Sequence, residues 1–261
     1  SSVTLLNCIF EENQSHDGGA IANDDKSFVT ATNCEFRWNG ASGNGGAVLC
    51  VVQGGSGIWV HSTFENCIFE ENQAENGGGI FADTMSTNET NLELLNCTFT
   101  GNIATASGGG VRIEIGSLVA TDCIFTNNSA AVSGGGMKIV YDHGTILTSV
   151  LVCGNSPDQI DSAGHQDGGG NCVSEICDSD SDGVYDCIDQ CPGVDDIDSD
   201  GDGVMDCIDQ CPGEDDIDSD GDGVMDCIDG CPDDPNKSDP GQCGCDEVDT
   251  DTDNDGVADC V

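Results

Sequence analysis

Basic residues are nearly absent from this chain of 261 residues. Lys and Arg together number 5 against 50 Asp and Glu, which gives a formal net charge of −45 at pH 7. A chain this acidic repels the phosphates of nucleic acids and the anionic surface of membranes, so nucleic acid is excluded as a partner. The charge also repels itself. The sequence therefore predicts either a disordered acidic segment or a fold in which divalent cations neutralise the carboxylates.

Aromatic residues and long apolar runs are scarce too. Aromatic residues make up 5% of the chain, and no apolar run approaches the roughly 18 residues of a transmembrane segment. Glycine, at 37 residues, is abundant. This composition favours a repetitive architecture, in which short neighbouring units complete one core together. The chain begins at Ser1 with no initiator methionine or signal peptide, and we interpret it as a mature or truncated piece.

Residues 1–176 repeat a motif in which Phe is followed three residues later by Asn. Five copies keep both residues and a sixth is degenerate: Phe10…Asn13, Phe36…Asn39, Phe69…Asn72, Phe99…Asn102, Phe125…Asn128 and Val152…Asn155. A glycine run and an apolar residue follow in the five good copies, ending at Ile21, Val48, Ile80, Val111 and Met137. A repeat of this length predicts one solenoid coil per copy.

Apolar residues alternate with polar ones around each Phe, which is the pattern of β-strands. Cys stands two residues before each Phe, and we expect buried thiols that act as small hydrophobes there: Cys8, Cys34, Cys67, Cys97 and Cys123. Asn recurs at two corners, represented by Asn7 and Asn13, where we expect left-handed turns or amide ladders. The glycines predict a third corner with positive φ or close backbone approach.

These paired motifs resemble the repeats of chlamydial polymorphic outer-membrane proteins, over residues 3–155. The resemblance implies a right-handed parallel β-helix that is displayed outside the cell, often in adhesion. The rule that parallel crossovers are right-handed favours the same hand. We therefore expect a right-handed parallel β-helix of about six coils in residues 1–176.

Residues 177–261 follow a different repeat, D-S-D-x-D-G-V-x-D-C-I-D, with a fourth copy that has Thr for Ser and stops at Val261. Carboxylates at loop positions 1, 3, 5, 9 and 12, with Gly at 6, match an EF-hand loop, whose side chains and position 7 carbonyl converge on one Ca²⁺ ion. The predicted calcium ligands are Asp178, Asp180, Asp182, Val184, Asp186, Asp189, Asp198, Asp200, Asp202, Val204, Asp206, Asp209, Asp218, Asp220, Asp222, Val224, Asp226, Asp229, Asp251, Asp253, Asp255, Val257 and Asp259.

No amphipathic helices flank these loops. Cys and Pro punctuate them instead, as in Cys191-Pro192, Cys211-Pro212 and Cys231-Pro232. The pattern resembles thrombospondin type 3 repeats over residues 177–261, which implies a calcium-loaded array with little regular secondary structure. Further candidate ligands for a second ion are Asp195, Asp196, Asp215 and Asp216. We thus expect an all-β chain, with a β-helix followed by a calcium- and disulfide-stabilised tail.

The 18 Cys beside so many hard oxygen ligands favour an oxidising, extracellular or cell-surface location and Ca²⁺ over zinc. If each bridge encloses one calcium loop, the tail pairs are Cys177–Cys187, Cys191–Cys207, Cys211–Cys227 and Cys245–Cys260. Cys231–Cys243 would then close the Pro-rich segment, and Cys153–Cys172 would pin the last coil. Many other connectivities remain open.

Three function classes follow from these features. The first is an extracellular calcium-binding structural protein, the subunit of a head-to-tail filament, because an open solenoid end invites another chain. The second is a monomeric bacterial adhesin with a surface or polysaccharide ligand. The third is a polysaccharide-processing enzyme that uses Arg112, Lys138, Glu114, Asp142 and His143. We expect no catalysis, because an outward polar face explains those residues without any nucleophile or catalytic carboxylate pair.

Overall fold

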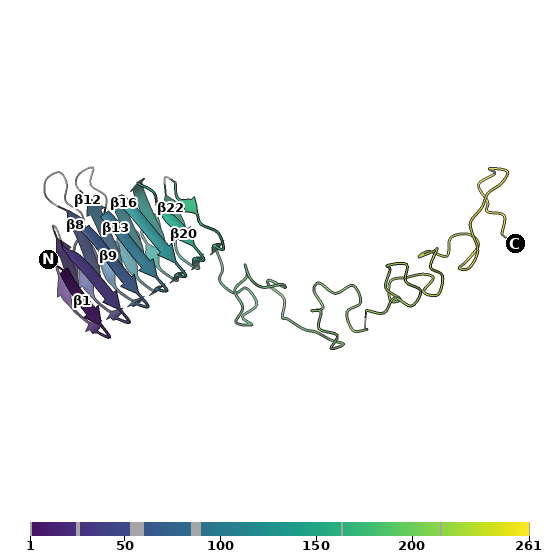
Figure 1. Ribbon diagram of the computed structural model, residues 1–261, viewed down its shortest axis with the longest axis horizontal. Coiled ribbons are helices and arrows are strands. Elements are labelled where there is room, and N and C mark those ends of the chain that lie inside the picture. Colours follow the sequence, from purple (N-terminus) through teal and green to yellow (C-terminus); the bar gives the residue numbers. More distant parts are fainter. Residues whose placement is uncertain are drawn as a thin grey trace. The chain divides into compact units, whose positions relative to one another are not determined.

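The computed structural model describes residues 2–24, 27–52, 60–84, 90–162, 164–214 and 216–260. The chain divides into two units, Ser1–Cys177 and Asp178–Val261. The first unit is built from short parallel β-strands stacked coil upon coil, and Figure 1 shows these strands side by side. It is a parallel β-solenoid, as the sequence predicts.

The strands form three sheets. The largest contains β1 (Ser2–Leu6), β4 (Ile21–Asp24), β5 (Phe28–Thr32), β8 (Val48–Val52), β9 (Val60–Glu65), β12 (Ile80–Thr84), β13 (Thr90–Leu95), β16 (Val111–Thr121), β19 (Met137–Asp142), β20 (Ile146–Thr148), β22 (Ile160–Ser162) and β23 (Gln166–Asp167). Strand β16 pairs with both β12 and β13, so it joins two faces of the solenoid into one sheet.

The second sheet carries the Phe positions. It contains β2 (Ile9–Glu11), β6 (Glu35–Arg37), β10 (Ile68–Glu70), β14 (Thr98–Thr100), β17 (Ile124–Thr126), β21 (Leu151–Cys153) and β24 (Cys172–Ser174). The third sheet contains β3 (Gln14–Ser15), β7 (Gly40–Ala41), β11 (Gln73–Asn76), β15 (Ile103–Ser107) and β18 (Ser129–Ala130). Because this sheet has five strands, the solenoid has about five complete turns, with further partial turns after them; the sequence suggests about six.

The core is a set of vertical ladders in which equivalent residues of successive coils contact one another. The rings of Phe10, Phe36, Phe69, Phe99 and Phe125 stack nearly parallel, with centroids 4.5–5.0 Å apart. Cys34, Cys67, Cys97 and Cys123 are buried free thiols beside them, and Cys8 is a half-buried one, as predicted. Each ladder buries apolar surface that a single coil would leave exposed, so stacking stabilises the whole unit.

The corners partly correct the sequence interpretation. Asn7, Asn33, Asn66, Asn96 and Asp122 have φ of 50–53°, as expected for left-handed corners. The second Asn row forms the amide ladder that was the other expectation, and it points inward without taking the left-handed conformation. Asn39, Asn72, Asn102 and Asn128 are buried and bond to one another in a ladder, and the left-handed residue is the one before each of them, such as Trp38 or Glu71. Buried amides satisfy backbone groups that the corner leaves unpaired.

The third corner needs glycine both because its backbone takes a positive φ and because neighbouring coils approach closely there. Gly45 has φ of 69°, a conformation that side chains rarely adopt. A Cβ on the next residue, Gly46, would lie 2.1 Å from the carbonyl oxygen of Gly78 in the next coil. Only glycine fits both positions, so the coils approach closely there.

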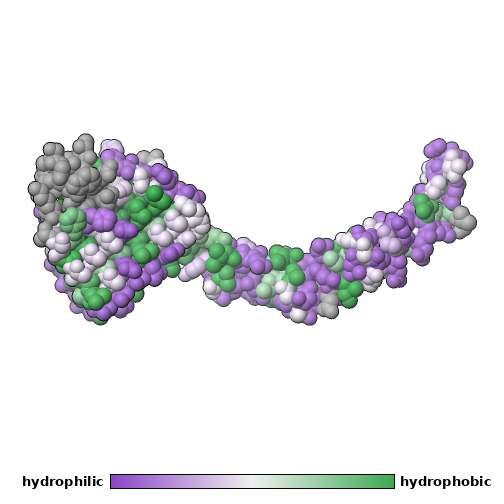
Figure 2. Space-filling model, viewed as in Figure 1, coloured by the Kyte–Doolittle hydropathy of each residue, from purple (hydrophilic) through white to green (hydrophobic). Residues whose placement is uncertain are grey.

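The second unit contains no helix or strand within residues 178–214 and 216–260. Its surface is largely hydrophilic (Figure 2), while Cys191, Cys211 and Cys231 are buried. In the described part of the chain, no helix is long and apolar enough to cross a membrane. Disulfides take the place of an apolar core in this unit.

The disulfides confirm two of the expected pairs and correct the others. Cys191–Cys207 and Cys211–Cys227 are bonded as predicted. Cys153 bonds to Cys177, Cys231 to Cys245 and Cys243 to Cys260, so the predicted pairs Cys153–Cys172, Cys177–Cys187, Cys231–Cys243 and Cys245–Cys260 are wrong. Cys172 and Cys187 are also disulfide-bonded. Cys243 bonds to Cys260 in place of Cys245, because Cys245 bonds to Cys231.

Candidate metal-binding loops

The first three aspartates of each loop converge. In Asp178, Asp180 and Asp182, one carboxylate oxygen from each residue lies within 4.8 Å of the others, and the same holds for Asp198–Asp200–Asp202, Asp218–Asp220–Asp222 and Asp251–Asp253–Asp255. These are positions 1, 3 and 5 of the four predicted loops. Three carboxylates so close together repel one another strongly unless a cation lies among them.

Hydrogen bonds within each loop fix these side chains. Both oxygens of Asp198 accept backbone N–H bonds, from Gly201 at 2.7 Å and Gly203 at 3.1 Å. Asp202 accepts one from Val204 at 2.7 Å. Such bonds from Asp to a backbone N–H a few residues on are typical of tight turns. The loop geometry is therefore encoded locally and recurs in every copy.

Positions 3 and 12 each leave a buried carboxylate oxygen without a partner. These atoms are Oδ2 of Asp180, Asp189, Asp200, Asp209, Asp220 and Asp229. In Asp209, the other oxygen accepts a bond from the N–H of Cys211 at 2.7 Å, so the carboxylate is anchored with its second oxygen free. A buried anionic oxygen with no donor costs free energy unless a cation or water satisfies it. Hard, anionic oxygens in this number fit a calcium ion.

The aspartate at position 9 of each of the first three loops bonds to the serine at position 2 of the same loop. Both oxygens of Asp206 are bonded to Ser199, one to its N–H at 2.8 Å and one to its hydroxyl at 2.6 Å. Asp186 and Asp226 bond to Ser179 and Ser219 in the same way. These predicted ligands therefore hold the start and end of the loop together. The serine at position 2 gave the signal for this role in the sequence.

The electrostatics agree with this division. Burial and the charges of neighbouring aspartates raise the pKa of Asp180, Asp200 and Asp220 above its ordinary value. The bonds from Ser199 and Ser219 lower the pKa of Asp206 and Asp226. The position 3 carboxylates thus lack a positive partner, whereas the position 9 carboxylates already have donors.

Two of the candidate ligands for a second ion lie beside the loops. Burial and the charges of Asp189, Asp182 and Asp180 raise the pKa of Asp196. Asp216 has the same relation to Asp209 and Asp202 in the next copy. Asp196 and Asp216 therefore add negative charge to the position 5 and 12 side of their loops. Asp215 lies outside the described residues.

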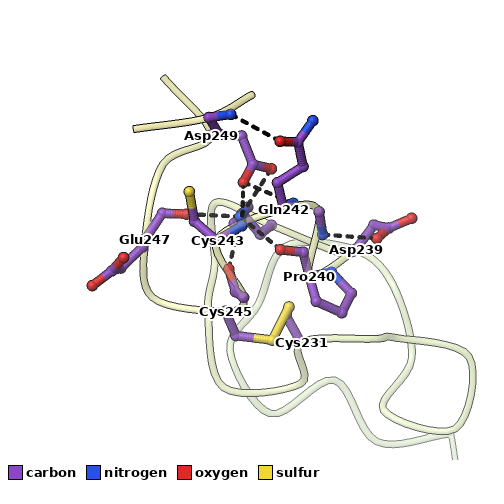
Figure 3. Close-up of polar contacts among 12 residues, drawn as sticks. Cys231, Asp239, Pro240, Gln242, Cys243, Cys245, Glu247 and Asp249 are labelled. Carbon is purple, nitrogen blue, oxygen red and sulfur yellow. Dashed lines mark hydrogen bonds and ion pairs between the residues drawn. A yellow bond between two sulfur atoms is a disulfide. The ribbon is translucent and has the colours of Figure 1, made fainter. Parts of the chain in front are cut away.

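One period of the tail has a lysine in place of the converging carboxylates. Continuing the 20-residue spacing from Asp218 places positions 1, 3 and 5 at Ser238, Pro240 and Gln242. The Lys237 ammonium donates to the carbonyls of Pro240, Gly244 and Glu247 at 2.7–3.0 Å, and it lies 3.2 Å from Oδ2 of Asp249. Figure 3 shows this cluster, with Asp249 beside Glu247 and Gln242. Here the Lys237 ammonium takes the place of a metal ion, because it contacts the carbonyl of Gly244 at position 7 and the carboxylate of Asp249 at position 12 of the altered loop.

Three of the candidate catalytic residues of the solenoid, Arg112, Glu114 and Lys138, form ion pairs, and Asp142 holds a turn. Arg112 and Lys138 occupy equivalent places on β16 and β19, as predicted. Arg112 bonds to Glu114 and to Asn76, and Lys138 pairs with Asp161. Asp142 accepts a bond from the N–H of Thr145 at 2.7 Å. These contacts hold neighbouring strands and turns together on the outer face.

Comparison with known proteins agrees with the fold. A family model described as a right handed beta helix region matches residues 1–149, and the chain belongs to this family. No curated protein and no solved structure matches the chain. The family defines the solenoid and its hand, and the disulfides of the tail indicate an extracellular or secreted protein.

Proposed function

We propose that this protein is an extracellular, calcium-binding structural protein, in which Ca²⁺ orders the acidic tail attached to a β-helix. The observation that carries the proposal is the set of buried, partnerless Oδ2 atoms at positions 3 and 12 of three consecutive loops. A calcium ion takes 6–8 oxygen ligands, and each loop offers carboxylates at positions 1, 3, 5 and 12 with a carbonyl at 7. The resemblance to thrombospondin type 3 repeats supports the same assignment.

In this proposal, calcium binding supplies the stabilisation of the folded tail that burial of an apolar core supplies in a globular domain. Without the ion, the carboxylates of each loop repel one another and the tail samples extended conformations. With it, binding to the ordered state alone stabilises that state by mass action. The protein is not an enzyme in this account, and the paired Arg112 and Lys138 serve the solenoid's outer face.

Calorimetric titration of the full chain with Ca²⁺, after treatment with EGTA, tests the proposal. We expect binding with a compaction of the tail that small-angle X-ray scattering detects. Asp209→Asn removes one charge at a buried, partnerless oxygen and should weaken one site about tenfold or more. The matched control is Asp233→Asn, an exposed tail aspartate outside the loops. Absence of calcium binding, or equal affinity in both variants, would overturn the proposal.

We further propose that the solenoid stacks head to tail into a filament. Strands β1, β2, β3 and β4 lie at the sheet edges, and Val3 and Ile9 of this first coil are exposed. A strand edge with apolar neighbours is a template for another coil, which in this proposal the adjacent subunit supplies. Electron microscopy of the full chain in millimolar Ca²⁺ should show linear polymers. Monodisperse particles would favour the alternative, a monomeric adhesin with the β-helix as its ligand platform.

A further inference from the structure

The sheet formed by β3, β7, β11, β15 and β18 carries a groove on its outer face. The groove has a volume of about 530 Å³, within the range of small-ligand sites. Its lining includes Gln14, Trp38, Gly40, Gln73 and Glu75. The groove belongs to the solenoid, so it is independent of the calcium-binding loops.

Three residues in the lining of the groove form one row across the sheet. Gln14, Gly40 and Gln73 are register partners on three adjacent strands, so their positions form one row across the sheet. Gln14 and Gln73 are exposed, whereas Gly40 contributes no side chain between them. Gly40 is itself buried, and a Cβ on it would lie 2.4 Å from Oε1 of Gln14, so the Gln14 amide folds over Gly40. The absence of a side chain at Gly40 makes room for this amide, which lines the groove together with Trp38.

Trp38 forms part of the groove at a position that disfavours it. The equivalent corner residues of the other coils are Glu12, Glu71, Gly101, Asn127 and Gly154, all with positive φ. Trp38 has φ of 54°, and a bulky side chain there is a genuine outlier. Outliers of this kind persist where the surroundings hold them, and they concentrate at ligand sites. Glycine or asparagine would be easier to accommodate at this corner.

The indole is exposed yet held in place. Trp38 is 45% exposed, and its Nε1 donates to Oε2 of Glu71 at 2.9 Å. The bond orients the ring at the edge of the groove and leaves apolar surface facing solvent. An oriented aromatic surface next to amides, a carboxylate and the hydroxyl of Ser42 matches the two needs of a sugar ring, an apolar face and a polar rim.

We propose that this groove binds a neutral oligosaccharide, with the indole of Trp38 against one sugar ring and Gln14, Gln73 and Glu75 bonding to its hydroxyls. The carboxylates of Glu71 and Glu75 repel acidic sugars, which excludes uronic acid polymers. A neutral glycan brings hydroxyl donors to the carboxylates and the amide oxygens, and acceptors to the amide nitrogens.

The test uses the full chain in Ca²⁺ with Trp59→Phe, so that tryptophan emission reports Trp38 alone. The probes are cellohexaose, mannohexaose and chitohexaose, with hexagalacturonate as the acidic comparison. We expect at least one neutral hexasaccharide to shift the emission with a dissociation constant below about 1 mM, and hexagalacturonate to give no shift. Calorimetry with the unmodified chain checks the same affinity.

Two variants and a matched control decide the assignment. Trp38→Asn places at this corner a residue that it accepts, since Asn127 occupies the equivalent corner of another coil with φ of 55°. The melting temperature of this variant should therefore equal or exceed that of the unmodified chain, while calorimetric binding falls at least tenfold. Gly40→Gln places a side chain where the Gln14 amide lies, displaces that amide and should weaken binding equally. Tyr141→Ala removes an exposed aromatic on β19 and should change nothing. No binding of any neutral probe, unchanged binding in Trp38→Asn, or preference for hexagalacturonate would overturn the proposal.

Discussion

Replacing Asn102 by alanine tests whether the buried amide ladder holds the coils together. Asn102 is fully buried. Its Nδ2 donates to the carbonyl of Phe69 at 2.8 Å and to Oδ1 of Asn128 at 2.9 Å. Its Oδ1 accepts from the backbone N–H and the Nδ2 of Asn72, at 3.1 and 2.9 Å. One side chain thus bonds to both neighbouring coils, the one that carries Phe69 and Asn72 and the one that carries Asn128.

The cost follows from which partners have another bond. Asn128 Oδ1 keeps a bond from the Asn102 backbone, and Asn72 Nδ2 keeps one to Phe36. The carbonyl of Phe69 keeps its place in the ladder between β10 and β14, where Glu70 pairs with Thr100. The N–H of Asn72 loses its bond. A buried backbone group left in this state costs about 1–3 kcal/mol, so Asn102→Ala should lower the free energy of unfolding by about 2 kcal/mol. In urea, the midpoint should fall by about 1 M.

The assay is far-ultraviolet circular dichroism of the full chain against urea, at fixed Ca²⁺. The matched control is Asn66→Gly, which removes a member of the exposed amide ladder at a left-handed corner that glycine accepts. We expect a loss below about 1 kcal/mol for that control. If Asn102→Ala cost no more than Asn66→Gly, the inward ladder would not be what couples the coils.

Two further predictions concern the tail. Lys237→Met removes the ammonium from its three carbonyls, so hydrogen exchange of residues 244–249 should speed up in Ca²⁺ and in EGTA alike. The control, Lys138→Met in the solenoid, should leave the exchange of those residues unchanged. Equal exchange rates in the two variants would contradict the role of Lys237. The raised pKa of Asp180, Asp200 and Asp220 makes their ionised forms unfavourable in the folded, calcium-free loops. Protonation therefore stabilises those loops as the pH falls through a native pKa above 3.8, and scattering in EGTA should show a more compact tail at about pH 4 than at about pH 7. The lowered pKa of Asp206 and Asp226 opposes this only below 3.8, so a tail that expands between pH 7 and 4 would contradict the assignment.

The sequence alone determined the features that depend on local spacing. The repeat of Phe and Asn set the coil, because a solenoid residue contacts its equivalents in the neighbouring copies. The Asp spacing set the loops, since positions 1, 3 and 5 converge through turns that the loop's own backbone forms, as at Asp198 with Gly201 and Gly203. Two disulfides that enclose positions 1 to 9 of a loop, Cys191–Cys207 and Cys211–Cys227, were predictable on the same ground.

Only the tertiary structure decided the features that depend on which residues meet across coils or bridges. Spacing could not tell that Cys153 bonds to Cys177, because that pairing depends on where the last turn places its thiols. It could not tell that the Asn after each Phe turns inward while the preceding residue takes the left-handed corner. Nor could it show the groove that Trp38 lines, because a groove arises from side chains that lie on different strands and share no local pattern.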